Sequence, residues 1–101
     1  MEVIYINVTL TGTNVLDERG RKYPKIRKSI KRWRNIIKTS TFLSGNALTQ
    51  AFGGYDYVPP RCHVFNLSDG FRLIALIDFT SRIVVVDEIL SHPVYEKWEC
   101  V

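Results

Sequence analysis

The sequence predicts an α+β fold in which a small antiparallel sheet is packed by two or three helices. Three short apolar runs, at 61–67, 71–79 and 82–90, are separated by turn-forming residues, as in an antiparallel meander. Before them lies a segment in which apolar residues recur at helical spacing. All 101 residues are expected to form one domain, since 46% hydrophobic residues suffice for one modest core.

The first predicted element is a strand over residues 2–10, which are rich in β-branched and aromatic side chains. Both of its faces are largely apolar, so we expect an interior strand; the faces would carry Val3, Tyr5 and Asn7, and Ile4, Ile6 and Val8. Thr11-Gly12-Thr13-Asn14 should end it. A short helix over 15–19 is then predicted to end near Gly20.

A longer helix is predicted to begin at Pro24, because proline is well tolerated in a first helical turn. Its apolar residues recur at i, i+4, i+7 and i+11 and form a stripe for the core: Ile26, Ile30, Trp33 and Ile37. Basic residues fall largely outside that stripe, namely Lys25, Lys28, Lys31, Arg32 and Arg34. The helix should therefore bury one face and present a basic face to solvent or to a partner.

Charge is divided unevenly along the chain. Between Arg21 and Lys38 there are nine basic residues and no acidic one, whereas the rest of the chain has five basic and ten acidic residues. Such a segment favours a phosphate-rich partner, or an acidic protein, through electrostatic steering and counterion release. The alternative is a basic face that is simply solvated.

Three further elements complete the predicted order. Ser44-Gly45-Asn46 should begin a short helix through Phe52, which Gly53-Gly54 ends. Residues 55–60 are interpreted as a loop because two prolines close the segment. After the meander, Pro93 suits the first turn of a terminal helix through about Trp98.

Composition and motifs argue against several classes of protein. The longest nearly apolar run, 73–77, is too short to cross a membrane, and the N-terminal sequence lacks a signal-peptide pattern, so we expect a cytoplasmic protein without membrane association. Cys62 and Cys100 are expected to be reduced thiols rather than a disulfide, and their spacing does not favour a zinc site with a histidine. No glycine-rich phosphate loop or nucleophile elbow is present, and we expect neither metal nor cofactor.

Arg72 is the first candidate functional residue. It is the only charge in the interior of an otherwise apolar strand, on the face of Ile74 and Leu76. A guanidinium there costs desolvation energy unless it reaches water, a carboxylate or a phosphate. Two interpretations stay open: a phosphate site, or an ion pair with Asp78, Asp87 or Glu88.

The polar tail supplies the other candidates. His92, Tyr95 and Lys97 can transfer a proton, donate a hydrogen bond and stabilise an anion, respectively. The alternative is a tail in which Tyr95 and Trp98 pack on the sheet. Arg61 and His63, on one face of the first meander strand, are candidates for further phosphate contacts.

Several short phrases occur in a characteristic order: Tyr23-Pro24, Ala51-Phe52, Val64-Phe65-Asn66, a turn with Gly70, Phe71-Arg72-Leu73, and Ser91-His92-Pro93-Val94-Tyr95-Glu96-Lys97. In order and spacing, over residues 23 to 98, they resemble the HigB family of toxins in the RelE-like superfamily. Ser91 and Glu96 depart from the usual Thr and Asp of the family phrase. The N-terminal part aligns poorly.

The resemblance implies a RelE-like fold and a ribosome-dependent mRNA endonuclease of a type II toxin–antitoxin pair, neutralised by a HigA-like helix-turn-helix antitoxin. Metal-independent RNA cleavage requires a base for the 2′-hydroxyl, a cation for the phosphorane and an acid for the 5′-oxygen. For that chemistry, Arg72 is the candidate cation, His92 or Tyr95 the candidate base, and Lys97 or His92 the candidate acid or second stabiliser. The basic helix would bind phosphates of mRNA or of the ribosome.

Two other functions remain possible on the sequence alone. A non-catalytic RNA-binding or ribosome-binding module would keep the basic helix and the meander without needing the polar tail. A protein-interaction inhibitor would use the basic face against an acidic target.

Overall fold

The computed structural model describes residues 8–39 and 44–101. In these two ranges, four helices and five strands make an α+β fold, which confirms the predicted class. The strands are β1 (Thr9–Thr11), β2 (Tyr55–Val58), β3 (Cys62–Asn66), β4 (Arg72–Asp78) and β5 (Ile83–Leu90). The helices are α1 (Thr13–Lys22), α2 (Arg27–Thr39), α3 (Gly45–Ala51) and α4 (His92–Tyr95), and short 3-10 turns lie at Pro24–Ile26 and Ser68–Gly70.

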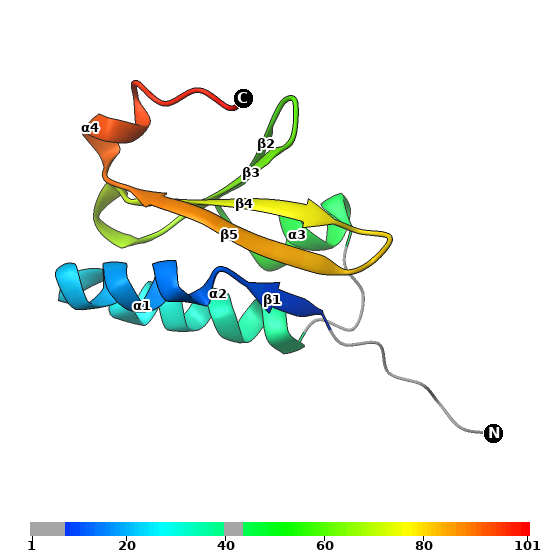
Figure 1. The fold of residues 1–101 in the computed structure, drawn as a ribbon, viewed down its shortest axis with the longest axis horizontal. Helices are drawn as coiled ribbons and strands as arrows, with labels where there is room; N and C mark the ends of the chain where they lie inside the picture. The colour runs from blue at the N-terminus through cyan, green and yellow to red at the C-terminus, as the bar shows by residue number, and fades with distance from the viewer. Residues whose placement is uncertain (1–7, 40–43) are drawn as a thin grey trace.

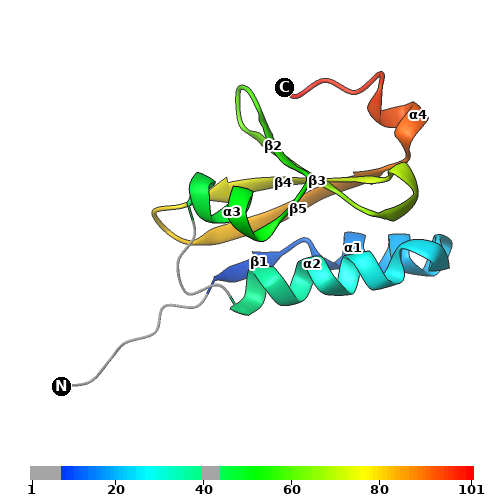
Figure 2. The same ribbon diagram turned by 180° about the vertical axis from the view of Figure 1, so that it is seen from behind.

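The sheet separates two unequal layers. Helices α1 and α2 run along one face, here called the inner face, whereas α4 and the C-terminal segment lie over the opposite, outer face (Figures 1 and 2). None of the helices in the described ranges is long and apolar enough to cross a membrane. The three meander strands lie within two residues of their predicted bounds.

The N-terminal strand differs from the prediction in position and direction. The strand order is β1-β5-β4-β3-β2, so β1 lies at an edge of the sheet, and it pairs with β5 in parallel. The expected interior position is therefore wrong for residues 9–11, and the part predicted over 2–7 lies outside the described residues. Gly12 explains the abrupt end of β1: its φ is +74°, and a side chain there would collide with the backbone oxygen of Val86.

Residues 55–58 form a strand, so their interpretation as a loop is wrong. β2 pairs antiparallel with β3, from Tyr55 opposite Phe65 to Val58 opposite Cys62. The two tyrosines and the valine favour a strand, and the prolines lie in the turn that follows, where their lack of an N–H costs no ladder bond.

Helix α1 extends past its predicted end because Gly20 lies inside it. Gly20 is buried where α1 meets α2, with Arg27 Cγ and Ile30 Cδ1 next to the position that a Cβ would occupy. Its backbone oxygen also accepts a hydrogen bond of 2.8 Å from Arg27 Nε. This glycine serves close helix packing rather than helix termination.

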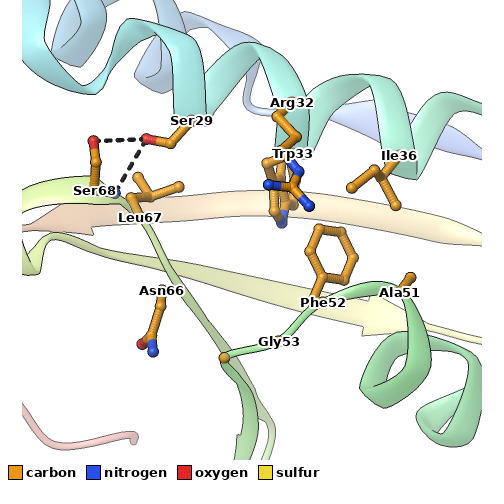
Figure 3. Close-up of a pocket in the computed structure, with 11 residues that line it drawn as sticks. Ser29, Arg32, Trp33, Ile36, Ala51, Phe52, Gly53, Asn66, Leu67 and Ser68 are labelled. Carbon is orange, nitrogen blue, oxygen red and sulfur yellow. Dashed lines mark hydrogen bonds between the residues drawn. The ribbon is translucent and has the colours of Figure 1, made fainter.

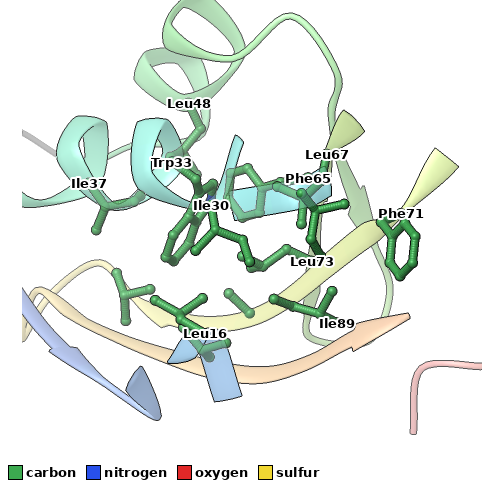
Figure 4. Close-up of a cluster of buried hydrophobic side chains, with 14 of the residues drawn as sticks. Leu16, Ile30, Trp33, Ile37, Leu48, Phe65, Leu67, Phe71, Leu73 and Ile89 are labelled. Carbon is green, nitrogen blue, oxygen red and sulfur yellow. The ribbon is translucent and has the colours of Figure 1, made fainter. Parts of the chain in front are cut away.

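The main core lies between the helices and the inner face. Its largest members come from α1, the 3-10 turn before α2, α2, α3 and the three central strands (Figure 4). The stripe predicted on the long helix is buried throughout: Ile26, Ile30, Trp33 and Ile37. Trp33 meets Phe65 edge-on, with ring centroids 5.6 Å apart, which ties α2 to β3.

A smaller cluster occupies the outer face. Buried Cys62, Val64, Ile74 and Leu90 are covered by Tyr95 and Trp98 from the C-terminal segment. A β-bulge in β5 changes which of its residues face the outer side. Ala75 pairs with Val86 but Ile74 pairs with Glu88, so Asp87 is an extra residue without a partner in β4. Val86 and Ile89 consequently both face the inner core, and Leu90 faces outward.

Candidate functional site

Arg72 is the first residue of β4 and lies on the outer face, where the turn before it orients its side chain. Its Nη1 donates hydrogen bonds of 2.9 Å to the Gly70 backbone oxygen and 3.2 Å to that of Phe71. Within the described residues it forms no ion pair, so the predicted alternative of a pair with Asp78, Asp87 or Glu88 is wrong. Two backbone carbonyls leave the rest of the guanidinium's five N–H donors for another ligand.

Tyr95 covers Arg72 from α4. The guanidinium carbon lies 5.6 Å from the centre of the Tyr95 ring, within cation–π range. The same ring stacks on Trp98, with ring centroids 5.6 Å apart and an interplanar angle of 22°. Tyr95 and Trp98 thus pack on the sheet, as the alternative interpretation of the tail predicts, and the Tyr95 ring also contacts Arg72.

His92 opens α4 next to the turn that precedes Arg72. A Cβ on Gly70 would lie 3.1 Å from His92 Cβ, and Gly70 has a φ of +78°, so only glycine suits this close approach. His92 Nδ1 lies 3.3 Å from Glu96 Oε1, and its side chain is 51% exposed. A carboxylate on one imidazole nitrogen favours the tautomer whose other nitrogen can accept a proton.

A hollow of about 570 Å³ opens beside these groups. His92, Tyr95 and Glu96 line it from α4 and the residue after it, and Val58 at the end of β2 and Pro59 after it line the opposite side. Arg72 does not line the hollow; it is joined to this group through the Tyr95 ring and through Gly70, which accepts a hydrogen bond from Arg72 and lies against His92. Lys97 is not part of this group: it is exposed in the following turn and forms no ion pair with any residue that the structure describes.

The basic face of α2 is largely open to solvent. Lys25, Lys28, Lys31 and Arg32 are exposed, whereas Arg34 is partly buried and its Nη1 lies 3.6 Å from Asp17 Oδ1 of α1. The beginning of this face adjoins the Arg72 turn. Lys25 Nζ lies 5.7 Å from the centre of the Phe71 ring, and Ser68 Oγ donates to the Lys25 backbone oxygen at 3.2 Å.

Arg61 and His63 do not form a common cationic surface. His63 is 5% exposed, packed among the rings of Tyr55, Tyr57 and Phe79, and its Nδ1 lies 2.7 Å from the Tyr55 hydroxyl. Burial lowers the pKa of His63 and raises that of Tyr55, so both side chains favour their neutral forms. Arg61 is exposed, and its Nε donates to the Val101 backbone oxygen at 2.8 Å.

The two cysteines form a disulfide, so the expectation of reduced thiols is wrong. The bond joins Cys62 of β3 to Cys100, 38 residues later, and anchors the C-terminal segment to the outer face. No local motif predicts such a pair; only the return of the tail across the sheet brings the two residues together.

Two residues near Arg72 were not predicted to have a role. Asn66 pairs with Arg72 across β3 and β4 and therefore shares its face, and Glu96 contacts His92. The sequence carries a signal for Asn66: a tight turn at 68–70 places position 66 opposite position 72. Asn66 also lines a pocket between α2 and the segments 51–54 and 66–68 (Figure 3).

Residues 26–98 match the sequence profile of the family described as HigB toxin, RelE-like toxic component of a toxin–antitoxin system. The match includes α2, the whole meander and the polar tail. Comparison with curated proteins found no match.

Proposed function

Because this chain belongs to the HigB family of RelE-like toxins, we propose that it is a ribosome-dependent mRNA endonuclease that inhibits translation in the cytoplasm. The toxin role follows from the family, which also implies an antitoxin partner. We propose that this antitoxin is HigA-like, with a helix-turn-helix domain. The observation that carries the nuclease proposal is the grouping of His92 and Tyr95 at an open hollow, with the Arg72 guanidinium against the Tyr95 ring.

Arg72 is proposed to bind the scissile phosphate. Its guanidinium has no carboxylate partner among the described residues, is oriented by two backbone carbonyls and faces the same side as His92. A cation held in place before the reaction stabilises the charge that develops on the phosphorane without a reorganisation cost. Tyr95 would keep the guanidinium in that orientation through its ring.

His92 is proposed as the base. With Nδ1 directed to Glu96, its Nε2 would take the proton of the ribose 2′-hydroxyl, whose oxygen then attacks phosphorus. The 5′-oxygen leaves with a proton, for which Lys97 or the Tyr95 hydroxyl is the candidate donor. The product would carry a 2′,3′-cyclic phosphate.

The ribosome is proposed to supply substrate alignment. The site is exposed, and Lys97 is not held against the other three groups in the described structure. Alignment by a partner can contribute a large part of rate enhancement by itself, so a loosely assembled site suits an enzyme that acts on a bound complex. The exposed cations Lys25, Lys28, Lys31 and Arg32 would hold RNA phosphates.

The decisive experiment is primer extension on mRNA from cells that express the chain, repeated with purified ribosomes. Arg72→Ala should lower cutting at least about 100-fold, the size expected when one preorganised charge stabiliser is lost. Arg72→Lys keeps the charge but loses the planar fork, so it should retain part of the activity. Circular dichroism would establish that each variant is folded.

Two further results of these experiments would decide between the nuclease and a binding module, and between the two roles of Tyr95. If translation falls while no cuts appear, the chain is a non-catalytic ribosome-binding module and the nuclease proposal is wrong. Tyr95→Phe separates the two roles of that residue: cutting persists if only the ring matters, and is lost if the hydroxyl moves a proton.

A further inference from the structure

The segment after β5 determines where two groups of the proposed cleavage site lie. His92 and Tyr95 belong to α4, which has only four residues, and the backbone N–H groups of residues 95–98 donate to backbone oxygens of residues 91–95. A helix of this length is not stable by itself in water. The position of α4 therefore depends on how the segment is attached to the outer face of the sheet.

Both noncovalent and covalent contacts attach this segment to the sheet. Two of its aromatic rings cover the outer apolar cluster. Arg61 Nε donates an exposed hydrogen bond of 2.8 Å to the Val101 backbone oxygen. The covalent attachment is the disulfide between Cys62 of β3 and Cys100. Because an exposed hydrogen bond contributes little in water, the disulfide is the contact that restricts the end of the segment most.

The disulfide also borders the hollow of the proposed cleavage site. Cys100 lines that hollow together with His92 and Tyr95. The opposite side is lined by Val58, which is the residue paired with Cys62 across β2 and β3. The bond thus joins the two sides of the hollow, and its opening would allow them to separate.

A thiol reagent can reach this bond from the hollow. Cys62 is 4% exposed, whereas Cys100 is partly exposed, so the Cys100 sulfur is the one open to attack. A thiolate of a dithiol reductant attacks it, forms a mixed disulfide and releases Cys62, which takes up a proton. The second thiolate of the reductant then closes the reductant's own disulfide and releases Cys100 as a thiol. Two electrons and two protons thus pass from the dithiol to the protein.

We propose that the Cys62–Cys100 bond is a redox switch of the proposed cleavage site. In the disulfide form, the segment holds the Tyr95 ring against the Arg72 guanidinium. Reduction frees the segment, so His92 and Tyr95 lose their fixed position relative to Arg72 and mRNA cutting falls. The inference rests on the proposed function, to which it adds regulation. Because a reducing cytoplasm disfavours disulfides, cutting would increase when the cell becomes oxidised.

The test compares mRNA cutting on purified ribosomes by the oxidised chain and by the chain reduced with dithiothreitol. The reductant is removed under nitrogen before ribosomes are added, so that it acts on the chain alone. The reduced chain should cut at least about tenfold more slowly, since a displacement of about 1 Å can lower a rate about 100-fold. Oxidised glutathione should restore cutting. The double variant Cys62→Ala/Cys100→Ala should cut at the reduced rate and respond to neither reagent.

A bridge that cannot be reduced provides the matched control. Diiodomethane joins the two reduced thiols as S–CH₂–S, with loss of two iodide ions and two protons, and dithiothreitol does not open this bridge. The bridged chain should cut at about the oxidised rate before and after treatment with dithiothreitol. Hydrogen exchange at the Tyr95 amide should accelerate only in the reduced, unbridged chain and in the double variant. Circular dichroism would establish that every form is folded.

The outcomes separate the switch from the nuclease. Equal cutting by the oxidised and reduced chains would overturn the switch and leave the nuclease intact. A bridged chain that cuts at the reduced rate would also overturn it, because the tether would not be the cause of activity. Faster cutting by the reduced chain would show that the bond restrains the site, which contradicts the proposed direction. If neither form cuts mRNA, the nuclease is wrong and the switch falls with it.

Discussion

The two faces of the sheet are built on different principles. The inner face is covered by α1 and α2 and contains nearly all of the large buried side chains. The outer face has a small apolar cluster, closed by two aromatic rings and a disulfide. The difference shows how a short chain can combine stability with an open site: apolar burial on one side leaves the other side free to carry Arg72 and His92 in contact with solvent.

Substitution of two leucines of β4 gives the strongest test of this difference between the two faces. Leu73 is fully buried in the inner core, whereas Leu76 is partly exposed on the outer face. Leu73→Ala should lower the free energy of unfolding by about 2–5 kcal/mol, and Leu76→Ala by less than about 2 kcal/mol, because a cavity forms only where neighbours cannot collapse. Urea unfolding measures both. Equal losses would mean that the two faces contribute alike.

Removal of the disulfide should loosen the outer face more than the inner one. Cys100→Ser, or reduction of the wild type, should lower the free energy of unfolding by about 2–4 kcal/mol and release the segment after Leu90. Hydrogen exchange at the amides of Tyr95 and Glu96 should then accelerate more than exchange at the α2 amides. The stability of the reduced form matters for the protein in the cell, because disulfides are uncommon in a reducing cytoplasm.

The control for this experiment is the Cys100→Ser variant itself, whose stability should not respond to reductant. If reduction leaves the exchange of α4 unchanged, the apolar cluster suffices to hold the tail and the disulfide is dispensable there.

The smallest of the three effects concerns His63. Its pKa is lowered by burial, so below about pH 6.5 the unfolded chain binds more protons than the folded one. The free energy of unfolding should therefore fall as pH drops through that range, and level off below the folded-state pKa. His63→Gln should flatten the dependence in thermal melts between pH 7.5 and 5. In His92→Gln, which alters the exposed histidine, the contribution of His63 should remain.

Much of the fold could be predicted because its signals are local. The stripe from Ile26 to Ile37 and the alternation in the meander strands are read directly from spacing, and all lie where predicted. The failures involve long-range partners. The pairing of β1 with β5 depends on where the chain returns, and Gly20 is explained only by the approach of α2.

The site was partly accessible to sequence reasoning for the same reason. Arg72, His92 and Tyr95 are conspicuous as polar groups at the ends of apolar strands, and the structure gathers them. Neither the burial of His63 nor the disulfide could be predicted, because both depend on what β2 and the tail place next to β3. The pocket at Asn66 is assembled from three separate segments and has no sequence signature of its own.

The bulge at Asp87 has a consequence for how this chain can change in evolution. Side chains of a strand alternate in a two-residue rhythm, and the single extra residue in β5 shifts that rhythm by one half-period before the strand ends. An insertion or deletion of one residue between Val86 and Leu90 would turn Leu90 inward and direct α4 toward the helices. Length changes in this part of β5 should therefore be tolerated in pairs, because only an even change keeps His92 above Gly70.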